Sequence, residues 1–243
     1  SFVNVQSQNW ECLGPFIPTT PLIDTGKMTP HGVGRLHSLA LLDRNGKRMV
    51  ASSSTGGTFI TKNYGKNWES NYNYAYMTGA NRIHAFSRRR YWIATCSNHL
   101  PTKHWGLGVL ETRNRGKSWQ ATGFEKYPSE FDLCCLYDLQ VHTKKKKVAY
   151  ITSETKVWTS TDRGKTWKLI LEDKEGDFRN IRISRRNPDI IFVTGKKLYK
   201  SVDGGKNFRN ITTNLTIQMP DKIANRITLA FSGKKEQTLF SLT

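Results

Sequence analysis

Two segments gather aromatic and histidine side chains that could bind a sugar or a peptide. Residues 71–76 alternate tyrosine with small or polar residues, and residues 98–106 read as a long inserted loop. Flat rings stack on sugar faces, and binding pockets favour aromatic linings. The candidate ligand residues in these segments are Tyr72, Tyr74, Tyr76, His99, His104 and Trp105. The alternative is that the tyrosines only pack between structural units.

Acidic residues do not form a recognisable catalytic pair. A glycosidase needs two carboxylates across the bond to be cleaved, but most of the acids outside tight turns lie in acidic linkers: Glu130, Asp132, Asp173, Glu175 and Asp177. The sequence has no Ser/His/Asp motif, phosphate-binding loop or zinc pattern. We therefore expect no cofactor and no metal, and favour a binding role over catalysis, with glycan hydrolysis as the second hypothesis.

The four cysteines have no metal-type spacing. Cys134 and Cys135 are neighbours that would point to opposite faces of a strand, so they should not bond to each other. The expectation is buried free thiols, with a Cys12–Cys96 disulfide as the alternative.

Positive charge dominates the composition. The chain has 38 Lys and Arg against 19 Asp and Glu, a net charge of +19. This excess favours an anionic partner, although exposed loops also keep such residues simply solvated. Nucleic acid is disfavoured because aromatic residues are not interleaved with the charges. The sequence has no long apolar run and does not open on a signal-peptide pattern, so an exported protein would already have lost its signal.

Four octets with one pattern divide the chain: Thr61–Trp68, Thr112–Trp119, Ser160–Trp167 and Ser201–Phe208. The third residue can close a tight turn with its side chain, the fifth supplies a positive φ, and the eighth provides apolar bulk. In order, these residues are Asn63, Gly65 and Trp68; Asn114, Gly116 and Trp119; Asp162, Gly164 and Trp167; and Asp203, Gly205 and Phe208.

The spacing of the octets predicts repeated β-sheets. Their glycines follow at intervals of 51, 48 and 41 residues, which suits propeller blades of about 40–45 residues with longer loops in two of them. Short β-rich runs and turn residues fill the intervals. We expect an all-β fold: a β-propeller of four-stranded antiparallel blades with Asp-box turns, incomplete in this chain. Residues 1–30 would be an entry segment, and residues 31–243 about four complete blades and a partial fifth, as a fragment of a longer chain.

The octets are identified as the Asp-box, or BNR, repeat. The segment from Gly34 to Trp68 resembles the opening blade of sortilin/VPS10-like and xyloglucanase-like propellers, and the entry around Trp10 resembles secreted Bacteroidota proteins of this kind. Such xyloglucanases place a catalytic Asp before the Gly-Gly of the first blade, where this chain has Ser52–Thr55 and no carboxylate. The Arg-Ile-Pro motif of the related sialidases is also absent. Photosystem assembly factors form a third alternative.

In this family the box turn shares one face with the turn between strands one and two. That geometry implies a basic face, with these residues at its centre: Arg88, Arg89, Arg90, Lys144, Lys145, Lys146, Lys147, Arg185 and Arg186. The aromatic candidates would lie on the opposite face. Arg35 and Arg82 would open innermost strands near the channel mouth, where they bind a carboxylate or form structural ion pairs.

The departures from the motifs of the resembling enzymes favour a non-catalytic scaffold or adhesin. We expect it to be secreted or held on the outer surface of a bacterial cell, by the type 9 route, as part of a larger surface complex. Its partner would be a protein, an anionic glycan or lipopolysaccharide.

Overall fold

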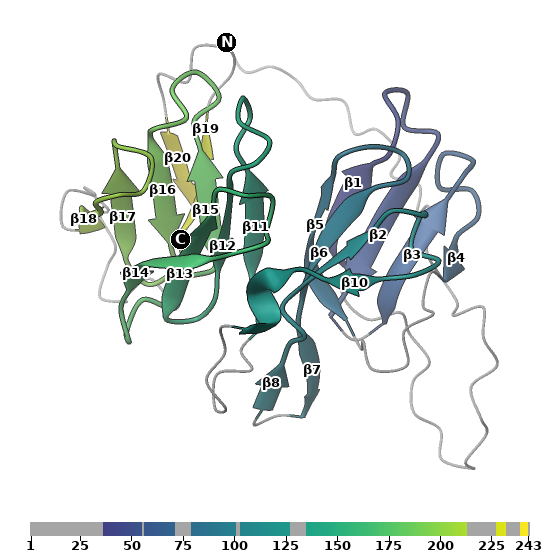
Figure 1. The fold of residues 1–243 in the computed structure, drawn as a ribbon, viewed down its shortest axis with the longest axis horizontal. Helices are drawn as coiled ribbons and strands as arrows, with labels where there is room; N and C mark the ends of the chain where they lie inside the picture. Colours follow the sequence, from purple (N-terminus) through teal and green to yellow (C-terminus); the bar gives the residue numbers. More distant parts are fainter. Residues whose placement is uncertain are drawn as a thin grey trace, which may run out of the picture.

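The computed structural model describes residues 36–54, 56–70, 79–100, 103–126, 135–212, 227–231 and 239–242. Within these ranges every regular element is a β-strand, apart from the short 3-10 helix η1 (Gly123–Lys126). The strands form four antiparallel four-stranded sheets and two two-stranded ones (Figure 1). The predicted entry segment, residues 1–30, lies outside the described residues.

Each four-stranded sheet is one blade. Blade 1 contains β1 (Leu36–Leu41), β2 (Met49–Ser53), β3 (Gly57–Thr61) and β4 (Glu69–Ser70). Blade 2 contains β5 (Ala80–Ala85), β6 (Tyr91–Thr95), β9 (Val109–Thr112) and β10 (Gln120–Ala121). Blade 3 contains β11 (Asp138–Val141), β12 (Ala149–Thr152), β13 (Lys156–Ser160) and β14 (Lys168–Glu172). Blade 4 contains β15 (Asn180–Ile183), β16 (Ile191–Thr194), β17 (Leu198–Ser201) and β18 (Arg209–Asn210).

The remaining strands form two hairpins. The pair β19 (Thr228–Phe231) and β20 (Leu239–Leu242) follows blade 4 and begins a further sheet. The pair β7 (Ser97–Leu100) and β8 (Lys103–Trp105) is inserted between the second and third strands of blade 2. This insertion accounts for part of the long interval between the first two octets.

Burial follows the position of a strand in its blade. Every residue of β3 and β6 is buried. In β6, Tyr91 and Ile93 pack in the cluster with blade 1, and Trp92 and Ala94 pack in the cluster with blade 3, so neighbouring blades cover both faces of this strand. The outermost strands β4, β10 and β18 have only two residues each and are largely exposed. Short outer strands leave little unpaired backbone for edge-to-edge association.

The apolar core lies between the blades. Four clusters of buried side chains join blade 1 to blade 2, blade 2 to blade 3, blade 3 to blade 4, and blade 4 to β19. On β1, Leu39 and Leu41 point away from blade 2 and remain 59% and 55% exposed. This arrangement of face-to-face antiparallel sheets is an incomplete β-propeller, which confirms the fold expected from the octets.

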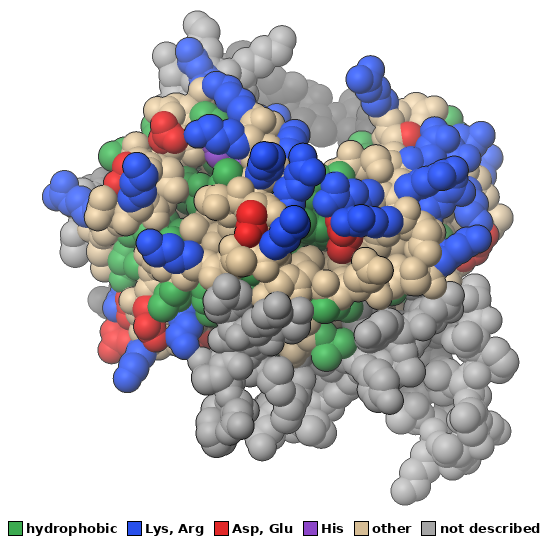
Figure 2. All heavy atoms as spheres, in the orientation of Figure 1, with side chains coloured by type: hydrophobic (Ala, Val, Ile, Leu, Met, Phe, Trp, Pro, Cys, Tyr) green, Lys and Arg blue, Asp and Glu red, His purple; other side chains and the backbone are tan. Residues whose placement is uncertain are grey.

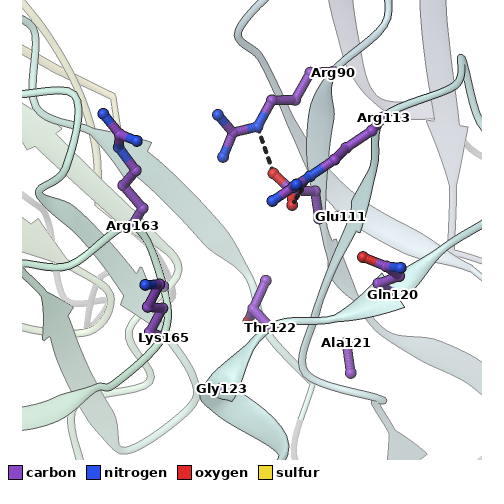
Figure 3. Close-up of a pocket in the computed structure, with 10 residues that line it drawn as sticks. Arg90, Glu111, Arg113, Gln120, Ala121, Thr122, Gly123, Arg163 and Lys165 are labelled. Carbon is purple, nitrogen blue, oxygen red and sulfur yellow. Dashed lines mark hydrogen bonds and ion pairs between the residues drawn. The ribbon is translucent and has the colours of Figure 1, made fainter.

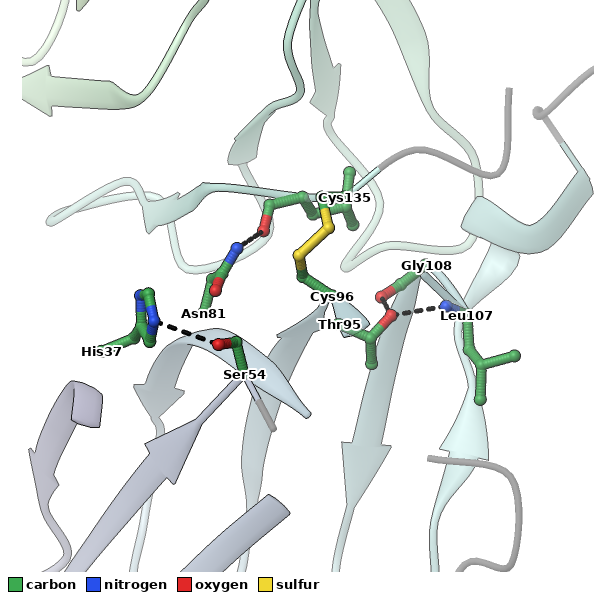
Figure 4. The surroundings of a disulfide bond; sticks show 9 residues. His37, Ser54, Asn81, Thr95, Cys96, Leu107, Gly108 and Cys135 are labelled. Carbon is green, nitrogen blue, oxygen red and sulfur yellow. Dashed lines mark hydrogen bonds between the residues drawn. A yellow bond between two sulfur atoms is a disulfide. The ribbon is translucent and has the colours of Figure 1, made fainter. Parts of the chain in front are cut away.

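The expected free thiols are wrong for Cys96 and Cys135, whereas Cys12 and Cys134 lie outside the described residues. Cys96, directly after β6, is bonded to Cys135, before β11, with a Cα–Cα distance of 4.4 Å (Figure 4). The bond therefore joins blades 2 and 3 and excludes the Cys12–Cys96 alternative. Sequence spacing could not find this pair, since the two residues are 39 positions apart and meet only when the two blades dock.

Candidate anion-binding face

The four boxes share one hydrogen-bond pattern. In the third box the Ser160 Oγ accepts the backbone N–H of Gly164 at 2.8 Å and donates to Asp162 Oδ1 at 2.9 Å. Asp162 Oδ1 in turn accepts the N–H of Thr166 at 2.9 Å. Equivalent bonds occur in the other three boxes. Each turn is thus closed by two side-chain oxygens, as an Asx-type turn requires.

Each box contains two consecutive residues with positive φ. The fifth residue is always glycine, with φ between 81° and 87°. The fourth residue has φ of 62° at Tyr64, 68° at Arg115 and 66° at Arg163, and is glycine at Gly204 in the last box. Since left-handed φ is costly for a residue with a Cβ, three of the four turns hold a side chain in an unfavourable backbone conformation.

The aromatic residue of a box packs against the preceding blade. Trp119 belongs to the cluster between blades 1 and 2, and its ring lies 5.4 Å from that of Tyr91. Trp167 lies in the cluster between blades 2 and 3, and Phe208 packs against the one between blades 3 and 4. Trp68, in the first blade, is only partly buried. The boxes therefore set both the turn and the blade-to-blade spacing.

Backbone hydrogen bonds bring each box against the turn between the first two strands of its own blade. The N–H of the fourth box residue donates to the carbonyl of Lys47 in blade 1, Arg89 in blade 2, Lys147 in blade 3 and Asp189 in blade 4, at 2.9–3.1 Å. Both turns of every blade therefore lie on the same face of the propeller, here called the turn face.

The turn face carries most of the positive charge. It comprises residues 42–48, 61–68, 86–90, 112–119, 142–148, 160–167, 184–190 and 201–208, which hold 20 Lys and Arg but only four Asp and no Glu. Figure 2 shows Lys and Arg side chains spread across the upper part of the molecule, over these turns. The nine residues of the predicted basic face, in the turns of blades 2, 3 and 4, all lie here.

A cleft of about 630 Å³ opens on the turn face where blade 2 meets blade 3 (Figure 3). Glu111, at the end of blade 2, accepts a hydrogen bond from Arg90 Nε at 2.5 Å and one from Arg113 Nε at 2.8 Å. The indole N–H of Trp92 donates a third, at 3.0 Å. Burial acts to raise the pKa of Glu111, but these hydrogen bonds outweigh it and lower the pKa below the usual value.

The opposite wall of the cleft is the box of blade 3. It contributes Arg163 and Lys165, both exposed, and neither side chain forms an ion pair within the described part of the chain. Figure 3 shows Arg90 and Arg113 on the blade 2 side and these two residues on the blade 3 side. The walls meet where the Gly123 N–H donates to the Gly164 carbonyl at 2.8 Å.

Gly123 is required at this junction. A Cβ at that position would overlap the Lys165 carbonyl oxygen, so any side chain would push the blade 3 box outward. A smaller hollow of about 240 Å³ lies next to the cleft and shares Arg113 with it. Its other lining residues are Arg89, Asn114, Arg115 and Lys117.

The predicted aromatic platform stays a prediction, because most of it lies outside the described residues. Tyr72, Tyr74, Tyr76 and Arg35 lie outside the described residues. The backbone of His99, His104 and Trp105 forms the β7–β8 hairpin, which leaves blade 2 at the end opposite to the turn face (Figure 1).

Arg82 forms a structural ion pair, one of the two roles expected for it. Its Nε lies 3.0 Å from Asp138 Oδ1, and Arg182 Nη1 lies 2.6 Å from Asp138 Oδ2. Asp138 is only 1% exposed, so this triad links the innermost strands of blades 2, 3 and 4.

Acidic residues at the end of the blades opposite to the turn face also form ion pairs and hydrogen bonds. Lys197 Nζ lies 2.8 Å from Asp173 and 3.1 Å from Glu175. Tyr199 donates its hydroxyl to Asp173, and burial together with this bond raises the pKa of Tyr199 to about 12. Asp177 pairs with Arg179. Glu130 and Asp132 lie outside the described residues.

Among the described residues, no group of three or more His, Cys, Asp and Glu side chains could hold a metal ion. The same part of the chain contains no helix long and apolar enough to cross a membrane.

Comparisons with known proteins agree on the fold. The model of the BNR-Asp box repeat family matches residues 157–170, which cover the third box. No curated protein matches the chain.

Solved propellers align over most of the chain at low identity. An ancestral GH74 enzyme is 14% identical with a TM-score of 0.56, over 84% of this chain and 25% of its own. The GH74 xyloglucanase from Xanthomonas campestris is 13% identical with a TM-score of 0.57, over 75% of this chain and 31% of its own. YCF48 bound to D1 peptide is 15% identical with a TM-score of 0.53, over 76% of this chain and 56% of its own. The chain thus spans about a quarter to a half of these proteins, and the likeness concerns the fold alone.

Proposed function

We propose that this propeller is a non-catalytic binding module that takes an anionic partner on its turn face. The observation that carries the proposal is the hydrogen bonding between the two turns of every blade, which gathers 20 basic and four acidic residues on one surface. A surface with this imbalance attracts polyanions through its summed field, and added salt weakens that attraction.

Pairing of the acidic residues supports binding rather than hydrolysis. A retaining or inverting glycosidase needs one carboxyl group as proton donor and a second as nucleophile or base. Asp173 and Glu111 each accept hydrogen bonds from at least one cationic side chain, and these bonds lower the pKa of both carboxyl groups. Asp138 is held between Arg82 and Arg182. Ser52, Ser53 and Ser54 are buried, and they stand where the resembling xyloglucanases carry a catalytic Asp.

A protein is the partner that we favour for this face, and the YCF48 structure bound to a peptide supports this choice. The Cys96–Cys135 bond supports placing the module outside the cytoplasm, since disulfides persist in oxidising compartments. A place on the surface of a bacterial cell, within a larger complex, is part of the proposal.

The proposal is tested by measuring the affinity of the protein for two polyanions over a series of salt concentrations. Polyglutamate represents a peptide polyanion and heparin a glycan polyanion. We expect both to bind, and the affinity to fall steeply as salt rises. Replacing Lys145 and Lys147, exposed on the turn face, by Gln should weaken binding several-fold. The matched control replaces Lys174 and Lys196, which are equally exposed at the opposite end of their blades. Equal losses in the two double variants, or binding indifferent to salt, would refute the turn face as the site.

A further inference from the structure

In the cleft between blades 2 and 3, side chains that could bind a ligand are already held in place by their neighbours. Arg90 is fixed on both sides: its guanidinium carbon lies 4.9 Å from the centre of the Phe86 ring, and its Nε donates to Glu111. Glu111 is itself fixed by Trp92, whose ring is 1% exposed in the core. A cation held in place before a ligand arrives loses little entropy on binding.

Glu111 uses only the Nε edge of each arginine. Arg90 and Arg113 both donate Nε to this carboxylate. The far ends of the two guanidinium groups carry the Nη atoms, and Figure 3 shows that end of Arg90 pointing away from Glu111. Those ends carry the paired N–H donors that fit two oxygens of one oxyanion.

The charge of the cleft suits a dianion. Its lining includes four cationic side chains and one carboxylate, so three positive charges remain after Glu111 is counted. A carboxylate ligand would bring a single negative charge, whereas a phosphate monoester brings about 1.5 to 2 at neutral pH. The walls converge from two blades, as the multiple oxygens of a phosphate group need.

The volume suits more than a phosphate ion. About 630 Å³ lies within the range of pockets that hold whole small molecules. Beside the cations the lining consists of Gln120, Thr122 and backbone, with Ala121 as its one apolar side chain. Amide and hydroxyl groups of this kind hydrogen-bond to hydroxyls and offer little to an apolar ligand.

We propose that this cleft binds a phosphorylated sugar, with the phosphate between Arg90, Arg113, Arg163 and Lys165 and the sugar over Gln120 and Thr122. This inference rests on the turn face being an anion-binding surface and names one ligand class for it. The phosphosugar can be a free molecule or the headgroup of a lipid.

Calorimetry with glucose 6-phosphate, inorganic phosphate and glucose tests the assignment. The proposal expects glucose 6-phosphate to bind more tightly than phosphate, and glucose not to bind. Changing Arg163 and Lys165 together to Gln should weaken the binding of glucose 6-phosphate at least about tenfold, since each change removes a charged hydrogen-bond donor to the phosphate. Phosphate binding as tightly as glucose 6-phosphate would overturn the sugar part, and no binding of either would overturn the whole inference.

A matched control comes from the repeat itself. Lys66 and Lys206 occupy the box position of Lys165 in blades 1 and 4, and changing both to Gln removes the same charge from the turn face outside the cleft. This control should bind glucose 6-phosphate normally. Equal weakening in both double variants would show that the general field, and not the cleft, binds the ligand.

Vesicles separate the two sources of the phosphosugar. Phosphatidylcholine vesicles with and without lipid A, whose headgroup is a phosphorylated disaccharide, are sedimented with the protein. Binding to lipid A that glucose 6-phosphate displaces identifies the lipid headgroup, and glucose 6-phosphate binding without vesicle binding identifies a free phosphosugar. Vesicle binding that survives the Arg163 and Lys165 changes would contradict a role of the cleft in that binding.

The outcomes for the cleft and for the proposed function can be told apart. If the protein binds glucose 6-phosphate but not polyglutamate, the proposed function is refuted and the cleft assignment stands.

Discussion

The first hydroxyl of each box is the residue on which its turn depends most. Ser160 Oγ accepts the N–H of Gly164, a buried backbone donor that no other described group satisfies. An unsatisfied buried donor costs about 1–3 kcal/mol. We predict that Ser160→Ala lowers the free energy of unfolding in urea by about that amount, and that Ser160→Thr keeps most of it, because Thr61 and Thr112 have the same role in the first two boxes. An alanine variant as stable as the parent would show that the bond contributes nothing.

The fourth box position offers a test with opposite signs. Tyr64 has a φ of 62° and is 50% exposed, so Tyr64→Gly should relieve backbone strain. Glycine also raises the entropy of the unfolded chain, which offsets part of this gain. We expect a net rise in the free energy of unfolding of about 0.5–1 kcal/mol. Gly204 has a φ of 75° at the equivalent position, and Gly204→Ala should lower it by a similar amount. Thermal or urea unfolding measures both, and shifts of the same sign would contradict the account.

The box turns could be predicted from the sequence because their pattern is local. The polar side chain, the glycine and the aromatic residue of an octet act within eight residues or on the adjacent blade. The non-glycine positive φ at Arg115 and Arg163 was missed, since nothing in the residue types signals it. Glu111 and Arg113 could have been paired from their i, i+2 spacing, which puts both on one face of a strand, whereas the part played by Arg90 appears only when the blade is folded.

At the scale of the element, two contacts hold blades 2 and 3 together at opposite ends. The Gly123–Gly164 hydrogen bond closes the turn face, and the Cys96–Cys135 bond closes the other end. Neither could be predicted from the sequence, because each joins segments whose approach is decided by docking of the blades through the cluster that includes Trp92, Phe124 and Trp158.

Removing the disulfide should loosen the propeller without changing its fold. The Cys96→Ser/Cys135→Ser double variant should unfold with about 2–4 kcal/mol less free energy, as expected for a crosslink that closes a loop of 39 residues. Reduced wild type should match this variant, and circular dichroism should show an unchanged β-sheet spectrum. Identical stability of the oxidised and reduced proteins would contradict a constraint between the blades.

At the scale of the whole molecule, the concentration of positive charge affects titration as well as binding. Burial, and then the charges of Lys146 and Arg82, lower the pKa of His84 to about 4. The His84 imidazole is therefore protonated near pH 6.5 in the unfolded chain but only near pH 4 in the folded protein. Stability should accordingly fall as pH decreases through this window.

Replacing His84 should remove part of this pH dependence. His84 packs edge to face against Phe86, with ring centres 4.8 Å apart, so His84→Phe preserves the aromatic contact and abolishes the titration. Urea midpoints measured between pH 7 and pH 4 should decline less steeply in the variant than in the parent. Parallel declines would assign the acid sensitivity to other groups.

The fold is easier to predict from the sequence than the cleft, because the fold depends on local patterns and the cleft on contacts between blades. Repeats, charges and turns are visible in the sequence, and they predicted the blades and, through the family resemblance, the grouping of the basic turns. The cleft needs two blades in contact, with Gly123 against the box that carries Arg163, and no single segment contains that information.

Protection of individual lysines tests the anion-binding turn face most directly. The protein is acetylated briefly with and without saturating polyglutamate, and modification is read out by mass spectrometry. We predict that Lys66, Lys145 and Lys165 are protected, whereas Lys174 and Lys196 at the opposite end react as in the free protein. Protection of the second group, or uniform reactivity of all five, would contradict the claim that the paired turns of the blades form the surface that receives the partner.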